Sequence, residues 1–365
     1  MPRIDLAFLE RAGALAERGR YTVSPNPMVG AVVVRGGSVV GEGFHRRAGG
    51  PHAEVGALRQ AGSKARGADL YLTLEPCAHQ GRTPACAPVV VASGIRRVVI
   101  AAKDPNPLVA GRGVAALRRA GLEVVLAPAR LRRAEEERNE KFRAAIVGRR
   151  PFVLAKWASS LDGRIASARG ESRWITGEAA RRRALLLREE YDAVLVGAGT
   201  VAADDPRLTR RLGRARGLPH RRIVLDGRLR VPESARVFRG GGTIVATAAP
   251  PSHPKARRLR ARGVEVWSVP GRARGRVDLG SLLRALKPRG VTSLMVEGGA
   301  ETLGAFFEAG LVDRVAVFLA PTVVGGRAAL GAVGGRGFAL PEAAVVRDLR
   351  VERVGADRLV TGRLA

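Results

Sequence analysis

The first third of the chain alternates between amphipathic helical stretches and short apolar strands. Apolar residues recur at helical spacing over 5–19, and two apolar runs, 29–34 and 38–43, flank a glycine pair, a pattern typical of a β-hairpin. A helical run from Ala53 follows. The remaining predictions are a strand over 68–74, a helix over 88–94, a strand over 96–102, a helix over 113–120 and a strand over 123–127. Such strand–helix–strand units predict an α/β domain with helices on both faces of one sheet.

A second alternating series begins after a charged helical segment, 130–150, and Pro151, which we interpret as a domain boundary. We interpret 207–221 and the glycine-rich 239–242 as surface loops. The predicted strands are 152–158, 192–199, 222–227, 243–249, 264–269, 293–299 and 314–321, with helical patterns between several of them. With 365 residues and no internal repeat linking the halves, the chain is expected to form two α/β domains.

The net charge of +30 suggests a nucleic-acid partner, but the distribution of the basic residues does not support one. Only six of the 63 basic residues are lysine, and the arginines occur along the whole length with no continuous basic arm. A drift of the composition towards arginine is the simplest account of the charge, and a phosphorylated small substrate and a phosphate-rich cofactor would balance part of the remainder. The charge alone does not decide the function. We find no membrane span and no signal-peptide core, and therefore expect a cytoplasmic protein.

Both cysteines of the chain lie in one short motif, EPCAHQGRTPAC (75–86), and a histidine precedes it in PHAEV (51–55). His52, Cys77 and Cys86 supply one imidazole and two thiolates, which is a ligand set for zinc that leaves a fourth position open for water. Glu54, two residues from His52, suits a proton shuttle for hydrolytic deamination. Pro51 and Pro76 precede their ligands, and we predict a helix start at each.

Three other interpretations of this motif remain open. A closed structural zinc site would need a fourth ligand, for which His79 is the nearby candidate. A nucleic-acid-binding protein with a structural zinc would not depend on Glu54. An RNA or nucleoside deaminase fused to an accessory domain would share the zinc chemistry, although most zinc deaminases separate their cysteines by two residues and here eight intervene.

The second half offers a less specific signal, a glycine pair in EGGAETLGAFFEAG (297–310) between a strand and an amphipathic helix. The free amides at such a helix N-terminus can hold phosphate oxygens. Because the full G-x-G-x-x-G fingerprint is missing, we do not predict a Rossmann domain.

Four segments of the first half together resemble the deaminase domain of the bifunctional deaminase/reductases of riboflavin biosynthesis. They are SPNPMVGAVVV (24–34), PHAEV (51–55), LEPCAHQGRTPAC (74–86) and DPNPLVAGRG (104–113). The longer cysteine spacing is the rule in that family. The resemblance implies a cytidine-deaminase-like three-layer fold, zinc on His52, Cys77 and Cys86, proton transfer by Glu54, and a substrate contact by Asn26. Further candidates for substrate contacts are His45, His79, Arg82 and Asn106, for which a plain loop hydrogen bond is the alternative.

Four segments of the second half resemble the reductase domain of the same family, which has a dihydrofolate-reductase-like fold. They are KWASSLDGRIA (156–166), GESRWITG (170–177), VGAGTVAADDPRLTRR (196–211) and VEGGAETLGAFFEAGLVD (296–313). Implied NADPH contacts are Ala158, Trp174, Thr200, Asp204, Gly299, Ala300, Glu301, Thr302, Leu303, Gly304 and Ala305. Implied substrate contacts are Ser172, Arg188, Leu208, Arg211 and Glu297. Trp174 as core and Arg188 as a solvated charge are the alternatives, and at Gly227 many relatives carry a serine.

The resemblance as a whole implies a two-step enzyme acting on a phosphorylated pyrimidine. Residues 1–148 would deaminate 2,5-diamino-6-(5-phosphoribosylamino)pyrimidin-4-one with Zn²⁺, and residues 149–365 would reduce the ribosyl group with NADPH to give 5-amino-6-(5-phosphoribitylamino)uracil. It also implies a homo-oligomer assembled through the reductase domain, with neither nucleic acid nor membrane as a partner.

Overall fold

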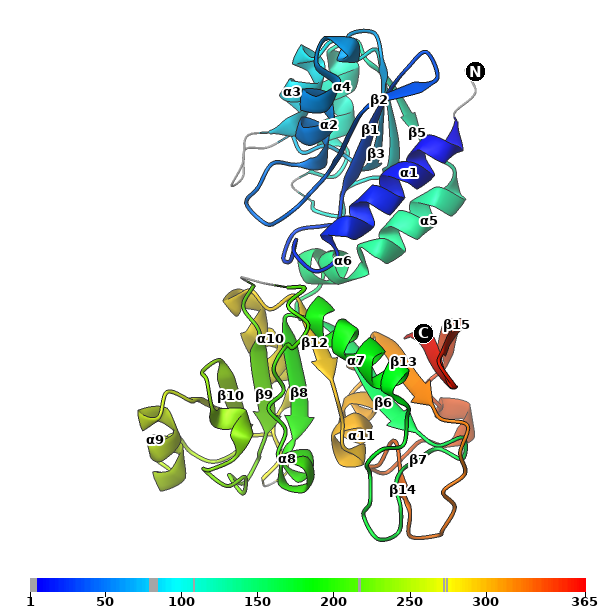
Figure 1. Ribbon diagram of the computed structural model, residues 1–365. Coiled ribbons are helices and arrows are strands. Elements are labelled where there is room, and N and C mark those ends of the chain that lie inside the picture. The colour runs from blue at the N-terminus through cyan, green and yellow to red at the C-terminus, as the bar shows by residue number, and fades with distance from the viewer. Residues whose placement is uncertain (1–4, 79–84, 108, 216–217, 272, 274) are drawn as a thin grey trace. The chain divides into compact units, whose positions relative to one another are not determined.

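The computed structural model describes residues 5–78, 85–107, 109–215, 218–271, 273 and 275–365, which form two compact units, Met1–Arg149 and Arg150–Ala365 (Figure 1). Within the described ranges, no helix combines the length and the apolar character that a membrane span requires. Short 3₁₀ helices occupy Glu17–Gly19, Gly62–Ala65, Arg236–Phe238, Lys287–Arg289 and Leu340–Glu342.

The N-terminal unit is built on a five-stranded sheet in the order β2-β1-β3-β4-β5. Its strands are β1 (Gly30–Arg35), β2 (Ser38–Phe44), β3 (Asp69–Leu74), β4 (Arg97–Ala102) and β5 (Glu123–Leu126). Strand β1 pairs antiparallel with both β2 and β3, whereas β3, β4 and β5 are parallel. The predicted hairpin is confirmed, and its turn uses Gly36 and Gly37 at φ values of +55° and +78°, which glycine adopts without strain.

Helices cover both faces of this sheet, as the alternating pattern predicted (Figure 1). They are α1 (Leu6–Ala16), α2 (Ala53–Ala61), α3 (Cys86–Ala92), α4 (Arg112–Arg119), α5 (Ala129–Arg138) and α6 (Glu140–Val147). Helices α2, α3 and α4 pack in one core, and α1 and α5 pack in a second core on the opposite face. Because successive strand residues point to opposite faces, β1 contributes Ala31 and Val33 to the first core and Val32 and Val34 to the second.

The close approach of α2 to β2 depends on two glycines. A Cβ atom at Gly41 would lie 2.2 Å from the Ala57 carbonyl oxygen, and one at Gly43 would lie 2.2 Å from that of Ala53. Larger residues would push α2 away from the sheet. Since His52 and Glu54 lie at the start of α2, these two glycines set the distance between those two residues and the sheet.

The segment 130–150, expected from its charge pattern to be one helical stretch, is divided at Asn139 into α5 and α6. Asn139 is buried, its side-chain oxygen accepts from the Met28 amide at 2.8 Å, and its side-chain nitrogen donates to the Met28 carbonyl at 3.0 Å. These two bonds satisfy the backbone of the loop before β1. The helix break therefore anchors the segment that carries Asn26.

The C-terminal unit is built on a nine-stranded sheet in the order β11-β10-β9-β8-β12-β6-β13-β16-β15, with a separate two-stranded sheet, β14-β7. The strands are β6 (Phe152–Ser159), β7 (Arg164–Ala166), β8 (Ala193–Gly197), β9 (Arg221–Leu225), β10 (Thr243–Thr247), β11 (Glu265–Ser268), β12 (Ser293–Val296), β13 (Arg314–Leu319), β14 (Leu330–Gly331), β15 (Val346–Val354) and β16 (Asp357–Leu364). The helices are α7 (Glu178–Glu190), α8 (Ala198–Asp204), α9 (Pro254–Ala261), α10 (Leu279–Leu286) and α11 (Ala300–Glu308).

The nine-stranded sheet is parallel from β11 to β13, and only β16 and β15 run antiparallel to their neighbours. Its central strands are buried on both faces, as expected for parallel strands covered by helices. The carboxyl ends of the parallel strands β6, β8, β9 and β12 all lie on the same side of the sheet. In α/β folds, ligands bind at the carboxyl ends of the strands.

The β15–β16 hairpin was not predicted from the sequence. Strand β15 carries five charged residues among nine and is exposed over most of its length, so it lacks the apolar alternation of a half-buried strand. It forms one edge of the sheet and pairs with β16 only. Because both faces of β15 are largely exposed, its sequence does not alternate between apolar and polar residues, and the strand could not be predicted from that pattern.

Candidate functional site

Three of the predicted metal ligands converge in the N-terminal unit. His52 Nδ1 lies 3.7 Å from Cys77 Sγ and 3.1 Å from Cys86 Sγ, and the three ligand atoms all lie within 4.8 Å of one another. In the described part of the chain, no other group of three histidine, cysteine or acidic side chains meets this geometry. The three predicted ligands therefore meet at one point of the fold.

The three ligands come from three local structures. His52 is the N-cap of α2, as the proline before it suggested, and Cys86 is the first residue of α3. The predicted helix start at Cys77 is wrong, because Cys77 follows β3 in a loop. Its carbonyl accepts from the amides of Cys86 and Ala87, both at 3.1 Å, so the start of α3 is bound to this loop. Backbone hydrogen bonds thus hold the two thiols together although eight residues separate them.

The donor set fits a zinc ion. With bonds of about 2.1 Å to nitrogen and 2.3 Å to sulfur, a tetrahedral ion separates these two ligands by about 3.6 Å. The two nitrogen–sulfur distances bracket that value. The pKa of Cys77 falls to about 4 because its sulfur accepts a hydrogen bond from Cys86. The pKa of Cys86 is raised, because Cys86 is the donor in that bond and because it is buried. A cation bound between the two sulfurs would stabilise both of them as thiolates.

Glu54 lies next to the ligands and is buried from solvent, with 3% of its surface exposed. Burial raises the pKa of its carboxyl group, and a hydrogen bond with Cys86 places that group beside the thiols. A carboxyl group that gains and loses a proton readily in a dry site suits proton transfer. His79, the proposed fourth ligand of a closed site, and Arg82 both lie outside the described residues.

His45 lies next to the ligand His52, and Asn26 is hydrogen-bonded to His45. His45 is buried, its Nδ1 donates to the Pro51 carbonyl at 3.1 Å, and its Nε2 consequently accepts from Asn26 Nδ2 at 3.0 Å. Its ring meets the His52 ring edge-on at 5.3 Å between centroids. Burial lowers the pKa of His45, which keeps the ring neutral for these two bonds. His45 thus links Asn26 to the histidine ligand.

Glu75 is a residue of this site that sequence reasoning missed. It is buried, and its carboxylate accepts from the amides of Asp104 at 3.3 Å, Gly111 at 3.0 Å and Val114 at 2.9 Å. These bonds fold the 104–113 loop, which contains the candidate Asn106, against the loop of Cys77. Asn106 itself accepts through its carbonyl from Val109 and Ala110. The only sign of Glu75 in the sequence was its place in the cysteine motif, directly before Pro76.

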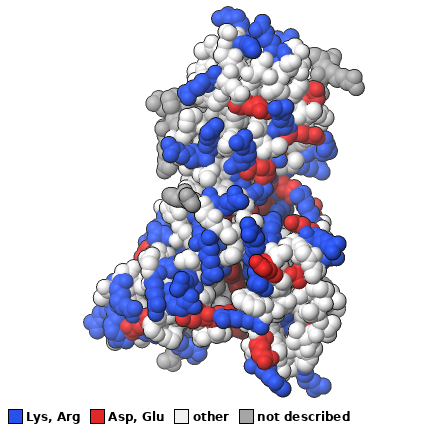
Figure 2. Space-filling view, in the orientation of Figure 1, with Lys and Arg blue, Asp and Glu red and all other residues white. Residues whose placement is uncertain are grey.

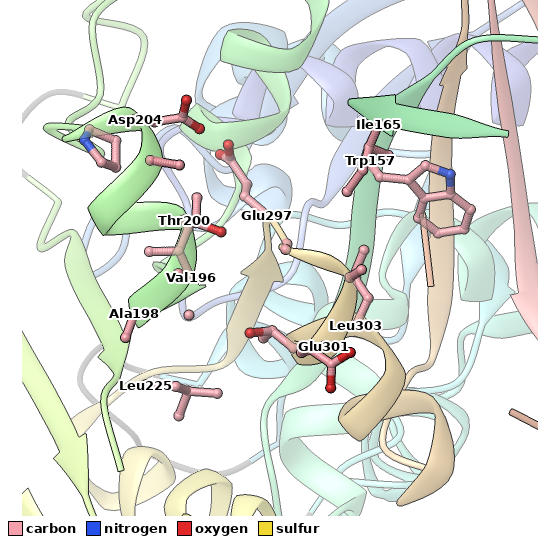
Figure 3. A pocket seen from close by; sticks show the side chains of 18 of the residues that line it. Trp157, Ile165, Val196, Ala198, Thr200, Asp204, Leu225, Glu297, Glu301 and Leu303 are labelled. Carbon is pink, nitrogen blue, oxygen red and sulfur yellow. The ribbon is translucent and has the colours of Figure 1, made fainter. Parts of the chain in front are cut away.

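A large open cavity of about 2080 Å³ lies at the carboxyl ends of the parallel strands in the C-terminal unit (Figure 3). Ligand pockets for one small molecule usually measure about 300–1,000 Å³, so this cavity has room for a dinucleotide and a second molecule. All but one of the predicted reductase contacts line it: Ala158, Ser172, Trp174, Arg188, Thr200, Asp204, Leu208, Arg211, Glu297, Gly299, Ala300, Glu301, Thr302, Leu303 and Ala305. The exception is Gly304, where a Cβ atom would lie 2.2 Å from the Gly334 carbonyl oxygen.

The floor of the cavity carries a buried ion pair. Arg188 donates from Nε and Nη2 to the two carboxylate oxygens of Glu297, at 2.7 and 2.8 Å, and Lys156 Nζ lies 3.8 Å from the same carboxylate. The Arg188 side chain is only 12% exposed, so the alternative of a solvated charge is wrong. Burial would raise the pKa of Glu297, but Arg188 and Lys156 outweigh it and lower that pKa to about 2. Glu297 is therefore ionised at any working pH.

Helix α8 and the start of α11 frame the cavity (Figure 3). Thr200 and Asp204 lie on α8, and Glu301 and Leu303 lie on α11 across from them. A Cβ atom at Gly299 would lie 2.9 Å from Thr200 Oγ1, so this glycine keeps the first turn of α11 open. The first amides of a helix lack partners within it, and here they suit the phosphate oxygens of a nucleotide.

Trp174 is not a core residue, and Gly227 lies where a larger side chain would clash with the backbone. Trp174 is 71% exposed at the cavity wall, with the Arg181 guanidinium 4.6 Å from its ring centroid, so the alternative that it is ordinary core is wrong. Gly227 lines the cavity, and a Cβ atom there would lie 2.0 Å from the Gly275 carbonyl oxygen. A serine cannot be accommodated at position 227 without moving the segment around Gly275.

Two family models match the chain, one in each unit. Residues 2–102 match the cytidine and deoxycytidylate deaminase zinc-binding region, and residues 151–360 match the RibD C-terminal domain. The riboflavin biosynthesis protein RibD of Aquifex aeolicus is 44% identical over 359 residues, which cover 98% of each chain.

Solved structures agree with these matches over nearly the whole chain. RibD of Acinetobacter baumannii superposes with a TM-score of 0.87 at 37% identity and 99% coverage of both chains. The diaminohydroxyphosphoribosylaminopyrimidine deaminase/5-amino-6-(5-phosphoribosylamino)uracil reductase of Thermotoga maritima gives a TM-score of 0.84 at 37% identity and 98% coverage of both. An RNA or nucleoside deaminase with an accessory domain is not favoured, since both units match one enzyme in order. The chain belongs to the RibD family, the zinc- and NADPH-dependent bifunctional deaminase/reductases of riboflavin biosynthesis.

Proposed function

We propose that His52, Cys77 and Cys86 hold the zinc ion of the deaminase and that Glu54 is its catalytic acid–base. The observation that carries this assignment is the convergence of one ring nitrogen and two sulfurs beside a buried carboxyl group. When bound, zinc lowers the pKa of a water molecule towards about 7, which makes a nucleophile available at neutral pH. We assign this activity to residues 1–148 and the reductase activity to residues 149–365.

In the deamination, Glu54 moves protons between water and the pyrimidine. Its carboxylate takes one proton from the attacking water and passes it to a ring nitrogen; it then takes the second proton, from the hydroxyl group so formed, and passes it to the departing amine. Water and the exocyclic amine are thereby exchanged for a carbonyl and ammonia. Asn26 contacts the substrate, and its amide is oriented by the bond to His45 Nε2.

In the reduction, NADPH would supply a hydride to C1′ of the ribosyl group, which becomes the CH₂ bonded to the amine nitrogen, while the ring oxygen leaves C1′, takes up a proton and becomes a hydroxyl group of the ribityl chain. Ala158, Trp174, Thr200, Asp204 and the start of α11 from Gly299 hold the cofactor. Ser172, Leu208 and Arg211 contact the phosphorylated sugar, together with the Arg188–Glu297 pair. The Arg211 guanidinium suits the phosphate, since two parallel N–H groups match two of its oxygens, whereas Nε and Nη2 of Arg188 are already bonded to Glu297.

Replacing Cys86 with serine separates the two activities. The variant is expected to lose bound zinc and ammonia release, because a neutral hydroxyl replaces a thiolate ligand. Oxidation of NADPH with supplied 5-amino-6-(5-phosphoribosylamino)uracil should continue at the wild-type rate. Metal analysis and separate assays of ammonia and NADPH check this result, and a variant that keeps its zinc and releases ammonia normally would contradict the assignment.

We propose that the protein is a cytoplasmic enzyme that acts on a small molecule and does not bind nucleic acid. On the face seen in Figure 2, lysine and arginine are spread over both units and mixed with acidic residues instead of forming one stripe. Binding to DNA or RNA requires a concentrated basic surface along the phosphate backbone. Tight RNA binding at physiological salt would argue against this proposal.

We also propose a homo-oligomer in which a second copy covers the β15 edge of the C-terminal unit. Leu349 and Val351 on β15 are 61% and 66% exposed, and exposed apolar side chains on an edge strand favour association. Leu349→Asp should therefore lower the molar mass measured by light scattering. The matched control is Leu340→Asp, since Leu340 is 92% exposed but lies outside the strand, and equal behaviour of the two variants would count against this edge.

A further inference from the structure

One loop of the C-terminal unit, 205–215, carries two of the proposed substrate contacts. Leu208 and Arg211 both line the cavity, and Leu208 has a φ of +55°, a conformation that leucine rarely adopts. The loop is not part of a helix or strand. Its shape must therefore come from bonds to neighbouring elements.

The amides of this loop converge on a single carboxylate, that of Glu189 on α7. Oε1 accepts from the amides of Arg211 at 3.0 Å and Leu212 at 2.9 Å, and Oε2 accepts from those of Arg214 at 3.0 Å and Ala215 at 3.1 Å. Glu189 is 1% exposed. A buried carboxylate that accepts four amide bonds determines the course of the backbone around it, because each unmade bond would leave a buried donor.

The carbonyls of the same loop are bound from the other side by three basic side chains. His220 Nε2 donates to the Leu208 carbonyl at 3.1 Å, Arg188 Nη1 to that of Thr209 at 3.3 Å, and Arg222 Nη1 to that of Arg207 at 3.4 Å. Arg188 is the same side chain that pairs with Glu297 on the cavity floor. Adjacent residues of α7 thus fix the cavity floor and the loop in one arrangement.

We propose that Glu189 is a positioning residue for the phosphorylated substrate of the reductase: it acts through the backbone of the 205–215 loop to aim the Arg211 guanidinium at the phosphate. The inference rests on the proposed function, in which Arg211 contacts the phosphorylated sugar. Glu189 itself does not line the cavity. Without its carboxylate the loop loses the arrangement of amides that fixes the direction of Arg211.

The test is Glu189→Gln in the full-length enzyme, assayed with 5-amino-6-(5-phosphoribosylamino)uracil and NADPH. A glutamine oxygen satisfies one pair of amides, but its NH₂ group faces the other pair as a donor. We expect the KM for this substrate to rise at least about tenfold with little change in kcat, the signature of lost ground-state binding. With the dephosphorylated substrate the variant and the wild type should have equal KM values, and the dissociation constant of NADPH should not change.

The matched control is Asp192→Asn, since Asp192 is a buried carboxylate of the same unit whose Oδ2 accepts from the backbone and hydroxyls of Thr292 and Ser293, outside the cavity lining. It should lower stability without raising KM. An equal rise in KM for the dephosphorylated substrate, or in Asp192→Asn, would overturn the proposal.

A second pair of variants separates this inference from the proposed function. Arg211→Ala tests the substrate contact directly, so an unchanged KM in that variant would remove the proposed role of Arg211. A raised KM in Arg211→Ala with an unchanged KM in Glu189→Gln would overturn only the role of Glu189. If Glu189→Gln does not fold, Glu189→Asp decides: it keeps the charge but withdraws it by one methylene group, and an unchanged KM there overturns the proposal.

Discussion

Glu54→Gln is expected to reduce ammonia release by about a hundredfold or more while the zinc content stays at the wild-type level. The reason is that glutamine has nearly the shape of glutamate but cannot carry a proton between water and the pyrimidine, and general acid–base catalysis contributes about 10²–10⁴ in rate. The three ligand atoms do not involve Glu54, so the ion should remain bound. Metal analysis and an ammonia assay on the same preparation measure both quantities.

A matched control for this variant is Glu135→Gln. Glu135 is also a buried glutamate of the N-terminal unit, but it lies on α5, on the opposite face of the sheet from α2, and pairs with Arg138. Its replacement should lower stability and leave the deaminase rate per folded molecule unchanged. Loss of zinc together with ammonia release in Glu54→Gln would instead make Glu54 a residue that holds the metal site together.

The metal site could be predicted from the sequence because its chemistry is concentrated in few residues. The chain has two cysteines, both in one motif, and the histidine and glutamate are two positions apart. The start of α3 at Cys86 was placed two residues too late, yet this error did not matter, since ligand type and spacing carry the prediction. Only the structure shows that the Cys77 carbonyl, bonded to the amides at the start of α3, brings the thiols together.

The residues that shape the loops could not be predicted, for a physical reason. Glu75, Asn139 and Glu189 each bind backbone amides that lie roughly 20 to 110 positions away, and a backbone amide has no residue identity to recognise. In the sequence Glu189 is one acid in an arginine-rich helix, where a solvated side chain is the ordinary expectation. Its four bonds to the amides of the 205–215 loop, which only the fold reveals, give Glu189 its role.

Arg188→Met is expected to destabilise the C-terminal unit by about 3–5 kcal/mol and to abolish reduction of the deaminated substrate. Removing the arginine leaves the Glu297 carboxylate buried, at 10% exposure, with Lys156 at 3.8 Å as the nearest ammonium group among the described residues. All three tryptophans of the chain, Trp157, Trp174 and Trp267, belong to this unit. Their fluorescence during urea unfolding therefore reports the stability of the C-terminal unit alone.

The double variant Arg188→Met/Glu297→Gln provides the control. Replacing the stranded carboxylate with a neutral amide should restore part of the lost stability, because a buried unpaired charge costs more than a buried polar group. Reduction should stay absent, since both proposed substrate contacts are gone. A double variant less stable than Arg188→Met would show that Glu297 is well solvated without its partner, contrary to its burial.

The same pair predicts opposite responses to acid in the two proteins. In the wild type the pKa of Glu297 is lowered to about 2 from an ordinary value of 4.5, so its contribution to stability is complete above pH 4.5 and is lost as the pH falls from 4.5 towards 2. In Arg188→Met we expect burial to outweigh Lys156, so that the pKa of Glu297 rises above its ordinary value. The folded variant then binds the proton more tightly than the unfolded chain, and its stability relative to the wild type should increase as the pH falls from 7 to 5. Urea unfolding at several pH values measures this slope, and parallel pH profiles for the two proteins would show that Arg188 does not set the ionisation of Glu297.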